Sequence, residues 1–203
     1  MRIIARQGIR SFAAGVGLLA LIVFPAVRTA HAAAAATPES VIRAWPAPER
    51  AAAGAMLAKY GPPSQYDRRA LVWFNNGNWK RTIVYRRALH RSGKAPGKDF
   101  LQQTVGYIVP NDKLALLKSF NGRLEVSPTA GELSFASDSE ATNLLALNLA
   151  DEIVVGKRSV AQAREFFAKT SRLAASGKSS SYMDGLRFDV DNNRYMTPTG
   201  ADQ

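Results

Sequence analysis

The sequence predicts an α+β domain: an antiparallel sheet of about four to six strands, with an N-terminal helix and a C-terminal helical pair packed on it. Three observations favour this class. Strand-like segments gather between residues 71 and 137, and the longest helical patterns follow them, whereas a parallel sheet would alternate strands and helices. Short turns join the strand-like segments, which favours antiparallel pairing. A short link also joins the last two helical segments, which favours an antiparallel helix pair.

The first predicted element is a helix over residues 48–60. Its alanines, Met56 and Leu57 have high helix propensity. Gly61 and the two prolines that follow are expected to end it, because glycine suits the position after a helix and proline cannot continue one.

A hairpin is expected next, with strands over 71–74 and 79–87. The Asn-Asn-Gly-Asn segment 75–78 lies between them, and Asn-Gly is a strong hairpin signal. In the second strand the odd-numbered side chains share one face and the even-numbered ones share the other. Both faces are similarly amphipathic, so the pattern leaves open which one is buried.

The rest of the chain alternates turns with apolar segments. Residues 90–98 form a predicted loop, 100–109 a strand, and a short helix follows Pro110 with Leu114, Leu117 and Phe120 at helical spacing. A second hairpin is expected over 123–127 and 132–137. Two helices then start at predicted capping boxes, Ser137-x-x-Glu140 and Ser159-x-x-Gln162, and end near Val155 and Ala175. A short last strand is expected over 186–190.

Residues 1–32 have the pattern of a secretory signal peptide. A basic segment is followed by the uncharged run Ser11–Val27 and by Ala30-His31-Ala32, so cleavage is expected near Ala32. The competing interpretation is an uncleaved anchor, but a bilayer span needs about 20 apolar residues. The protein is therefore expected to be periplasmic or secreted by a bacterium.

The remaining chain divides by composition. Residues 33–50 are an expected Ala/Pro-rich linker, 51–190 a single α+β domain, and 191–203 a flexible tail. Within the linker, Trp45 has two interpretations: it docks onto the domain, or it is a stray aromatic in a flexible segment.

The charge balance is basic, at +11 for the whole chain. Four arginines and no acids lie within residues 1–32, so about +7 remains after cleavage. This charge favours anionic partners such as lipid headgroups or lipopolysaccharide, and nucleic acid is not expected in an exported protein. There is no cysteine, which excludes disulfides, thiol nucleophiles and thiolate metal sites.

Few residues suit catalysis or metal binding. His90 is the one histidine left after cleavage, so a zinc site with several histidines is excluded. No serine-nucleophile or phosphate-loop motif occurs. We expect no metal and no cofactor. Asp151 and Glu152 are adjacent on a helix and point about 100° apart, whereas Asn148 and Asp151 share a face. That polar pair either lines a cleft or, as we favour, hydrogen-bonds a neighbouring turn.

The strongest positive feature is a basic run from Lys80 to Lys98 that contains no acid. Arginine is suited to bidentate contact with phosphate, and two aromatic residues are interleaved. The candidate binding residues are Trp79, Arg81, Tyr85, Arg86, Arg87 and Arg91. The alternative is a solvated strand face whose charges protect a sheet edge from aggregation.

Two blocks, Leu71–Tyr85 and Asn143–Val154, resemble a family of uncharacterised exported bacterial proteins. The resemblance covers most of residues 51–190 and implies export, but no activity. Relatives often carry histidine at the position of Phe74 and in the loop of His90, and cysteine at Ser137. If they use those groups for a metal or for catalysis, this chain has lost the set. Residues 55–85 are also similar in architecture to small outer-membrane assembly lipoproteins.

The sequence therefore favours an exported, non-enzymatic module that binds a protein or an anionic envelope component. The alternative is a hydrolase of envelope polymers that acts through a carboxylate site containing Asp151.

Overall fold

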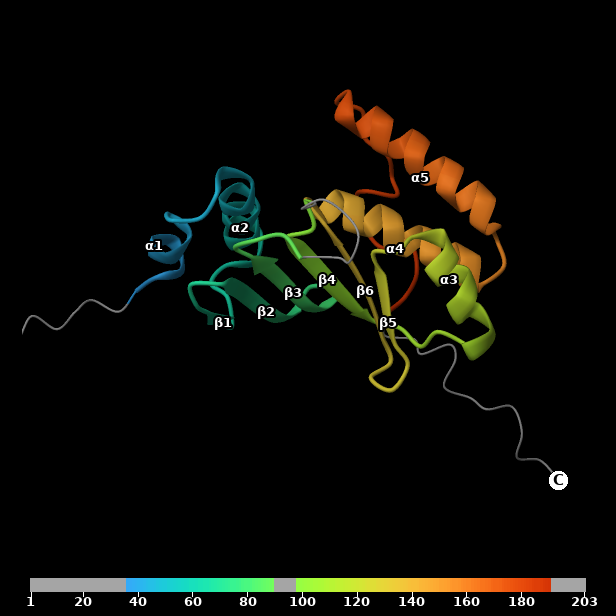
Figure 1. Cartoon of the computed structure of the whole chain (residues 1–203), viewed down its shortest axis with the longest axis horizontal. Coiled ribbons are helices and arrows are strands. Elements are labelled where there is room, and N and C mark those ends of the chain that lie inside the picture. Colours follow the sequence, from blue (N-terminus) through green and yellow to red (C-terminus); the bar gives the residue numbers. More distant parts are fainter. Residues whose placement is uncertain (1–35, 90–97, 191–203) are drawn as a thin grey trace, which may run out of the picture. The chain divides into compact units, whose positions relative to one another are not determined.

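A computed structural model describes residues 36–89 and 98–190, and it confirms the α+β class. Six antiparallel strands form one sheet in the order β1-β2-β3-β4-β6-β5, and helices pack on it (Figure 1). The expectations for the signal peptide with its cleavage near Ala32, for His90 and Arg91, and for the tail 191–203 lie outside the described residues.

The predicted elements between residues 47 and 175 appear in the expected order, and α1 and β1 are additional. The strands are β1 Gln65–Tyr66, β2 Ala70–Asn76, β3 Trp79–Tyr85, β4 Leu101–Gly106, β5 Leu124–Ser127 and β6 Glu132–Ser137. The helices are α1 Pro38–Ile42, α2 Ala47–Tyr60, α3 Leu114–Phe120 after a 3-10 turn at Asn111–Lys113, α4 Glu140–Val154 and α5 Val160–Ala175.

The segment expected to be a linker carries α1 and a docked tryptophan. The Thr37 hydroxyl accepts a hydrogen bond from the Ser40 N–H at the start of α1, as N-cap residues do. Trp45 is only 3% exposed, and Ile42 is buried beside it in the core under α2. Of the two interpretations of Trp45, docking onto the domain is confirmed.

The hairpin of β2 and β3 forms at the expected Asn-Gly turn. Its register runs from Ala70 opposite Tyr85 to Asn76 opposite Trp79. Thr82 and Val84 are buried, so the even-numbered face of β3 is covered by helices. Trp79 is buried as well, against this alternation. The shift occurs beside Asn75, whose φ of 51° is left-handed.

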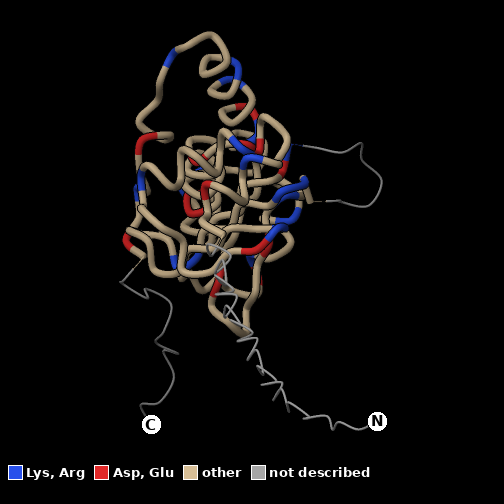
Figure 2. Tube along the Cα trace, turned by 90° about the vertical axis from the view of Figure 1, so that its left-hand side faces the viewer, with Lys and Arg blue, Asp and Glu red and all other residues tan. Residues whose placement is uncertain are grey.

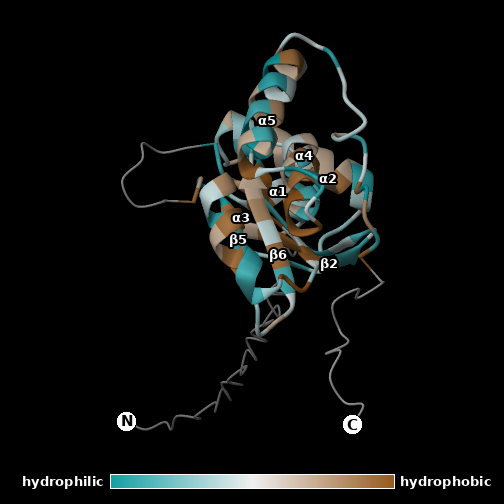
Figure 3. Ribbon diagram, turned by 90° about the vertical axis from the view of Figure 1, so that its right-hand side faces the viewer, coloured by the Kyte–Doolittle hydropathy of each residue, from teal (hydrophilic) through white to brown (hydrophobic). Residues whose placement is uncertain are grey.

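The core lies on the helix-covered face of the sheet in two clusters. Under α2, Ala53 and Met56 pack with Leu71, Trp73 and Val84. The larger cluster joins α4 to β4 and β6, and α3 and α5 cover the other sides of α4. Figure 3 shows hydrophobic residues along these helices and along β6. This layering leaves α4 buried on almost every side.

Two local predictions are wrong. Ser139, not Ser137, caps α4, and its side chain accepts from the Thr142 N–H. Ser137 ends β6, and its hydroxyl donates to Asn143 instead. Residues 186–190 form no strand, and the N–H of Arg187 donates to Asn148 of α4 instead of to a neighbouring strand. The capping box at Ser159 and Gln162 is confirmed.

Candidate anion-binding site

A pocket of about 390 Å³ opens at the end of the sheet where β2 begins and β3 ends. Tyr85, the last residue of β3, and the two arginines that follow it form one part of the wall. Arg69, in the turn between β1 and β2, forms another. The described lining thus consists of three arginines and one tyrosine: Arg69, Tyr85, Arg86 and Arg87.

Backbone hydrogen bonds fix where these side chains start. The Asp67 carboxylate accepts from the N–H groups of Arg69 (2.7 Å) and Ala70 (2.9 Å), which stabilises the tight turn. Those backbone hydrogen bonds lower the pKa of Asp67. The Arg86 N–H donates to the Arg69 carbonyl at 2.7 Å and continues the ladder beyond β3. Arg69 and Arg86 are therefore direct cross-strand neighbours.

The guanidinium groups of this pocket form no ion pair with a described carboxylate, although the charge of Asp67 acts on Arg69 over a longer distance. Among residues 36–89 and 98–190, Arg69, Arg86 and Arg87 form no ion pair. Arg86 makes one long hydrogen bond, 3.4 Å from its Nη2 to the carbonyl of Ala44. Like charges directly opposite in a strand pair are destabilising. The fold therefore holds uncompensated positive charge at this point.

Tyr85 contributes a neutral wall to the pocket. Its hydroxyl donates to Gln102 Oε1 at 2.9 Å, on the neighbouring strand β4. Burial, and next the negative charge of Glu125, raise the pKa of Tyr85. A phenol is protonated at neutral pH even at its ordinary pKa of about 10, so Tyr85 brings no negative charge to the arginines.

The structure divides the predicted basic run. Lys80 and Arg81 both pair with Glu132 of β6, at 3.0 and 3.1 Å, so an internal carboxylate offsets their charge. Burial raises the pKa of Glu132, but the hydrogen bonds from Lys80 and Arg81 outweigh it and the pKa is lowered. Trp79 is not part of the pocket. It is buried, and its indole N–H donates to Glu140. Tyr85, Arg86 and Arg87 are the predicted residues that the structure brings together.

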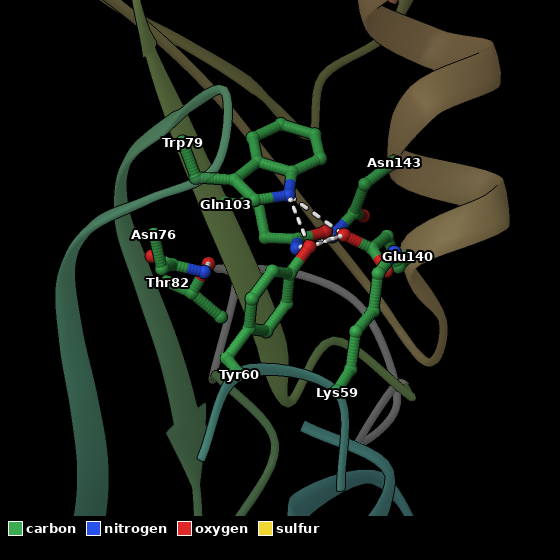
Figure 4. A network of polar contacts seen from close by, with 8 residues as sticks. All are labelled: Lys59, Tyr60, Asn76, Trp79, Thr82, Gln103, Glu140 and Asn143. Carbon is green, nitrogen blue, oxygen red and sulfur yellow. Dashed lines mark hydrogen bonds and ion pairs between the residues drawn. The ribbon is translucent and has the colours of Figure 1, made fainter. Parts of the chain in front are cut away.

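A second polar cluster surrounds Glu140, the first residue of α4 (Figure 4). Its Oε1 accepts from the Tyr60 hydroxyl, from Trp79 Nε1 at 2.7 Å and from Gln103 Nε2 at 3.0 Å. Its Oε2 pairs with Lys59 Nζ at 2.6 Å. Residues from α2, β3 and β4 thus converge on one carboxylate whose side chain is 12% exposed.

Further hydrogen bonds extend this cluster into the sheet. Asn143, one turn along α4, donates to Gln103 Oε1 at 3.0 Å and to the Leu101 carbonyl at 3.2 Å. Burial of Glu140 raises its pKa, but the hydrogen bonds from Lys59, Tyr60 and the other donors outweigh burial, so the pKa is lowered. A carboxylate that is ionised and engaged at both oxygens suits a structural role better than general-base catalysis.

The predicted polar pair on α4 is engaged with its surroundings. Asn148 Nδ2 donates to the carbonyls of Tyr182 and Gly185, at 3.0 and 2.9 Å, and its Oδ1 accepts from the Arg187 N–H at 2.7 Å. Asp151 accepts from the Tyr107 hydroxyl at 2.8 Å. For Asn148, the favoured interpretation of a bond to a neighbouring turn agrees with this geometry.

Sequence reasoning missed Arg69 as a member of the pocket. A signal was present, because the Asn-Gly turn sets the register of the hairpin. Counting outward from the pair Asn76 and Trp79 places Arg69 opposite Arg86. The Glu140 cluster carried no comparable signal, since its members come from four separate elements.

Two searches of the described part of the chain bear on the class of site. No group of three or more His, Asp or Glu residues there could hold a metal ion. No helix there is long and apolar enough to cross a bilayer.

A scan against protein-family models and searches of curated proteins and of solved structures found no match. The resemblance to exported bacterial proteins therefore stays a prediction.

Proposed function

We propose that this chain is an exported, non-enzymatic module that binds an anionic component of the bacterial envelope. Arg69, Arg86 and Arg87 supply the positive charge, and Tyr85 supplies contact area. The observation that carries the proposal is the set of three arginines around one pocket that form no ion pair with any described residue.

The chemistry of arginine supports an oxyanion as the ligand. A guanidinium group stays charged at every physiological pH and can donate two parallel hydrogen bonds to a phosphate or carboxylate. Such a ligand would also relieve the repulsion between Arg69 and Arg86, whose backbones are hydrogen-bonded. Binding and local stability would then be linked, since a ligand that binds the folded state stabilises it.

No specific observation favours the alternative of a hydrolase. Asp151, its proposed carboxylate, accepts a hydrogen bond from Tyr107, and Asn148 is engaged with the segment 182–187. The best-defined buried carboxylate, Glu140, is surrounded by donors. We therefore carry the binding module forward.

The test is binding of lipopolysaccharide by the exported protein, purified as the producing bacterium processes it. The double variant R86E/R87E is expected to bind at least tenfold more weakly at low salt. Raising the salt should weaken the wild type, because exposed charge pairing is screened over about 8–10 Å at physiological ionic strength.

The matched control is K169E/R172E, which changes the net charge equally on an exposed part of α5. It should bind like the wild type, and both variants should show a cooperative unfolding transition that confirms they are folded. Equal binding by folded R86E/R87E and wild type would remove the pocket from the function. Equal loss in both variants would show that only total charge matters.

A further inference from the structure

The pocket is part of a larger surface that we call the arginine end, defined by Arg43, Arg50, Arg68, Arg69, Arg86 and Arg87. These residues come from three segments: α1 with the start of α2, the turn between β1 and β2, and the stretch after β3. Figure 1 shows these segments at one end of the sheet, and Figure 2 faces that end.

Printed contacts tie the three segments together. Arg86 Nη2 reaches the Ala44 carbonyl at 3.4 Å, and the Arg86 N–H donates to the Arg69 carbonyl. Arg50 Nη1 donates to the Arg43 carbonyl at 3.2 Å. The arginine end is therefore one continuous surface, and its backbone is held in place by these contacts.

The charge of this surface is positive on balance. Residues 36–50, 65–70 and 86–87 contain six arginines, no lysine and three acids: Glu39, Glu49 and Asp67. The Asp67 carboxylate accepts two backbone hydrogen bonds within its own turn. Arg43 and Arg68 are exposed and, within the described residues, form no ion pair or side-chain hydrogen bond. Several guanidinium groups are thus directed at solvent outside the pocket.

The described chain also begins at this surface. The Tyr66 hydroxyl donates to the carbonyl of Ala36 at 2.8 Å, so the first described residue lies beside the β1–β2 turn. Eight residues, 28–35, separate it from the uncharged run Ser11–Val27. Eight extended residues span at most about 28 Å. Before cleavage near Ala32, only this short stretch of sequence lies between that run and Ala36.

We infer that the arginine end docks on the surface of an anionic phospholipid bilayer. This inference rests on the proposed function and names its partner. Arginines outside the pocket face the phosphates of neighbouring lipids while the pocket holds one headgroup. Tyr66, 42% exposed beside Ala36, has the apolar ring and polar tip that suit a membrane interface. A soluble anion would occupy the pocket but would leave Arg43 and Arg68 without a role.

The experiment is co-sedimentation of the exported protein with vesicles of phosphatidylglycerol and phosphatidylcholine, and with phosphatidylcholine alone. R43E/R68E alters the arginine end outside the pocket. It is expected to lower the partition coefficient on anionic vesicles at least tenfold, since each basic residue near such a surface contributes about a fivefold attraction. K169E/R172E should bind like the wild type, and neutral vesicles should recover little protein.

Two conservative variants separate the surface from the pocket. R43K/R68K should retain vesicle binding, because attraction to a charged surface needs the charge and not the guanidinium fork. R86K/R87K should bind a single headgroup phosphate in the pocket more weakly, because lysine cannot form the bidentate contact. Inorganic phosphate at 10-fold excess over lipid should compete weakly on vesicles if many arginines act together, whereas complete release would indicate a single phosphate site and overturn the inference.

The failure of this inference and of the proposed function can be told apart. Wild-type vesicle binding by R43E/R68E would overturn the docking surface. So would absence of binding to anionic vesicles by a wild-type protein that still binds lipopolysaccharide. In both cases a loss of lipopolysaccharide binding in R86E/R87E would keep the proposed function. Unchanged binding of every ligand by R86E/R87E would contradict both.

Discussion

Glu140 and the arginine end are two charged regions of one domain, and the fold treats them in opposite ways. One buried carboxylate receives hydrogen bonds from Tyr60, Trp79 and Gln103 and an ion pair from Lys59. In the pocket, three guanidinium groups receive no carboxylate from the described residues. The charge of Glu140 is paired within the domain, whereas the three arginines form no ion pair with the described residues.

This difference separates stability from function. Removing Glu140 would leave several buried donors unpaired, so its contribution belongs to the folded state. Removing an arginine from the pocket would leave no acceptor unpaired apart from the long contact with Ala44. Two like charges on neighbouring strand ends repel each other modestly, and an external anion would offset that repulsion.

The largest effect is expected from Glu140→Ala. The substitution leaves the Gln103 amide and the Tyr60 hydroxyl without this acceptor, and the Trp79 N–H keeps only its 3.1 Å bond to the Tyr60 hydroxyl. Removing one partner of a buried charged network costs about 3–5 kcal/mol. Urea unfolding at pH 7 should show the loss. The control Glu165→Ala, on an exposed part of α5, should stay within about 0.5 kcal/mol of the wild type.

The next effect concerns Asn148, which is 1% exposed and holds the C-terminal segment against α4. Asn148→Ala removes three hydrogen bonds to residues 182–187 and leaves backbone groups unpaired. We expect a loss of about 2–3 kcal/mol. Limited proteolysis should then cut near residue 185 before the rest of the domain. Wild-type stability would mean that this segment is held by packing alone.

Acid should weaken the Glu140 cluster. The folded pKa of Glu140 lies below its ordinary value of 4.5, because hydrogen bonds to the charged form outweigh burial. Its stabilising contribution is therefore present above the unfolded pKa and is lost as the pH falls through the folded pKa. Between pH 5 and pH 3, the unfolding free energy should fall less steeply in Glu140→Gln than in the wild type. Parallel curves would assign the acid sensitivity to Glu132 and Glu152, whose pKa values are lowered too.

Local signals predicted most of the fold. The Asn-Gly turn, the glycine and prolines after residue 60 and the capping box at Ser159 each act over a few residues, and each has its expected structural consequence. The predictions failed where residues distant in the sequence decide the local structure. Ser137 has the spacing of a capping residue, but pairing with β4 places it in a strand. Residues 186–190 have a strand-like composition, yet Asn148 supplies their partners.

The candidate site was predictable in part for the same reason. Arg86 and Arg87 stand out in the sequence as neighbours in a basic run. Arg81 belongs to the same run, but Glu132, 51 residues away, neutralises it. Trp79 is predicted to share a face with Arg81, but in the fold, beside the left-handed Asn75, Trp79 is buried and Arg81 is only partly so. Charge runs locate basic segments, and tertiary pairing decides which of their charges remain available.

The smallest expected effect is the sharpest test of the comparison. Arg69→Gln keeps the backbone hydrogen bond with Arg86 and removes one of two opposed charges. We expect stability at low salt to rise by about 0.2–0.5 kcal/mol, because like charges on opposite strands repel. In 0.5 M salt the gain should vanish through screening. The control Arg172→Gln, on exposed α5, should change stability little under either condition. A loss above about 1 kcal/mol in Arg69→Gln would show that Arg69, like Glu140, is held for the fold, and the arginine end would then lose its argument for an external anion.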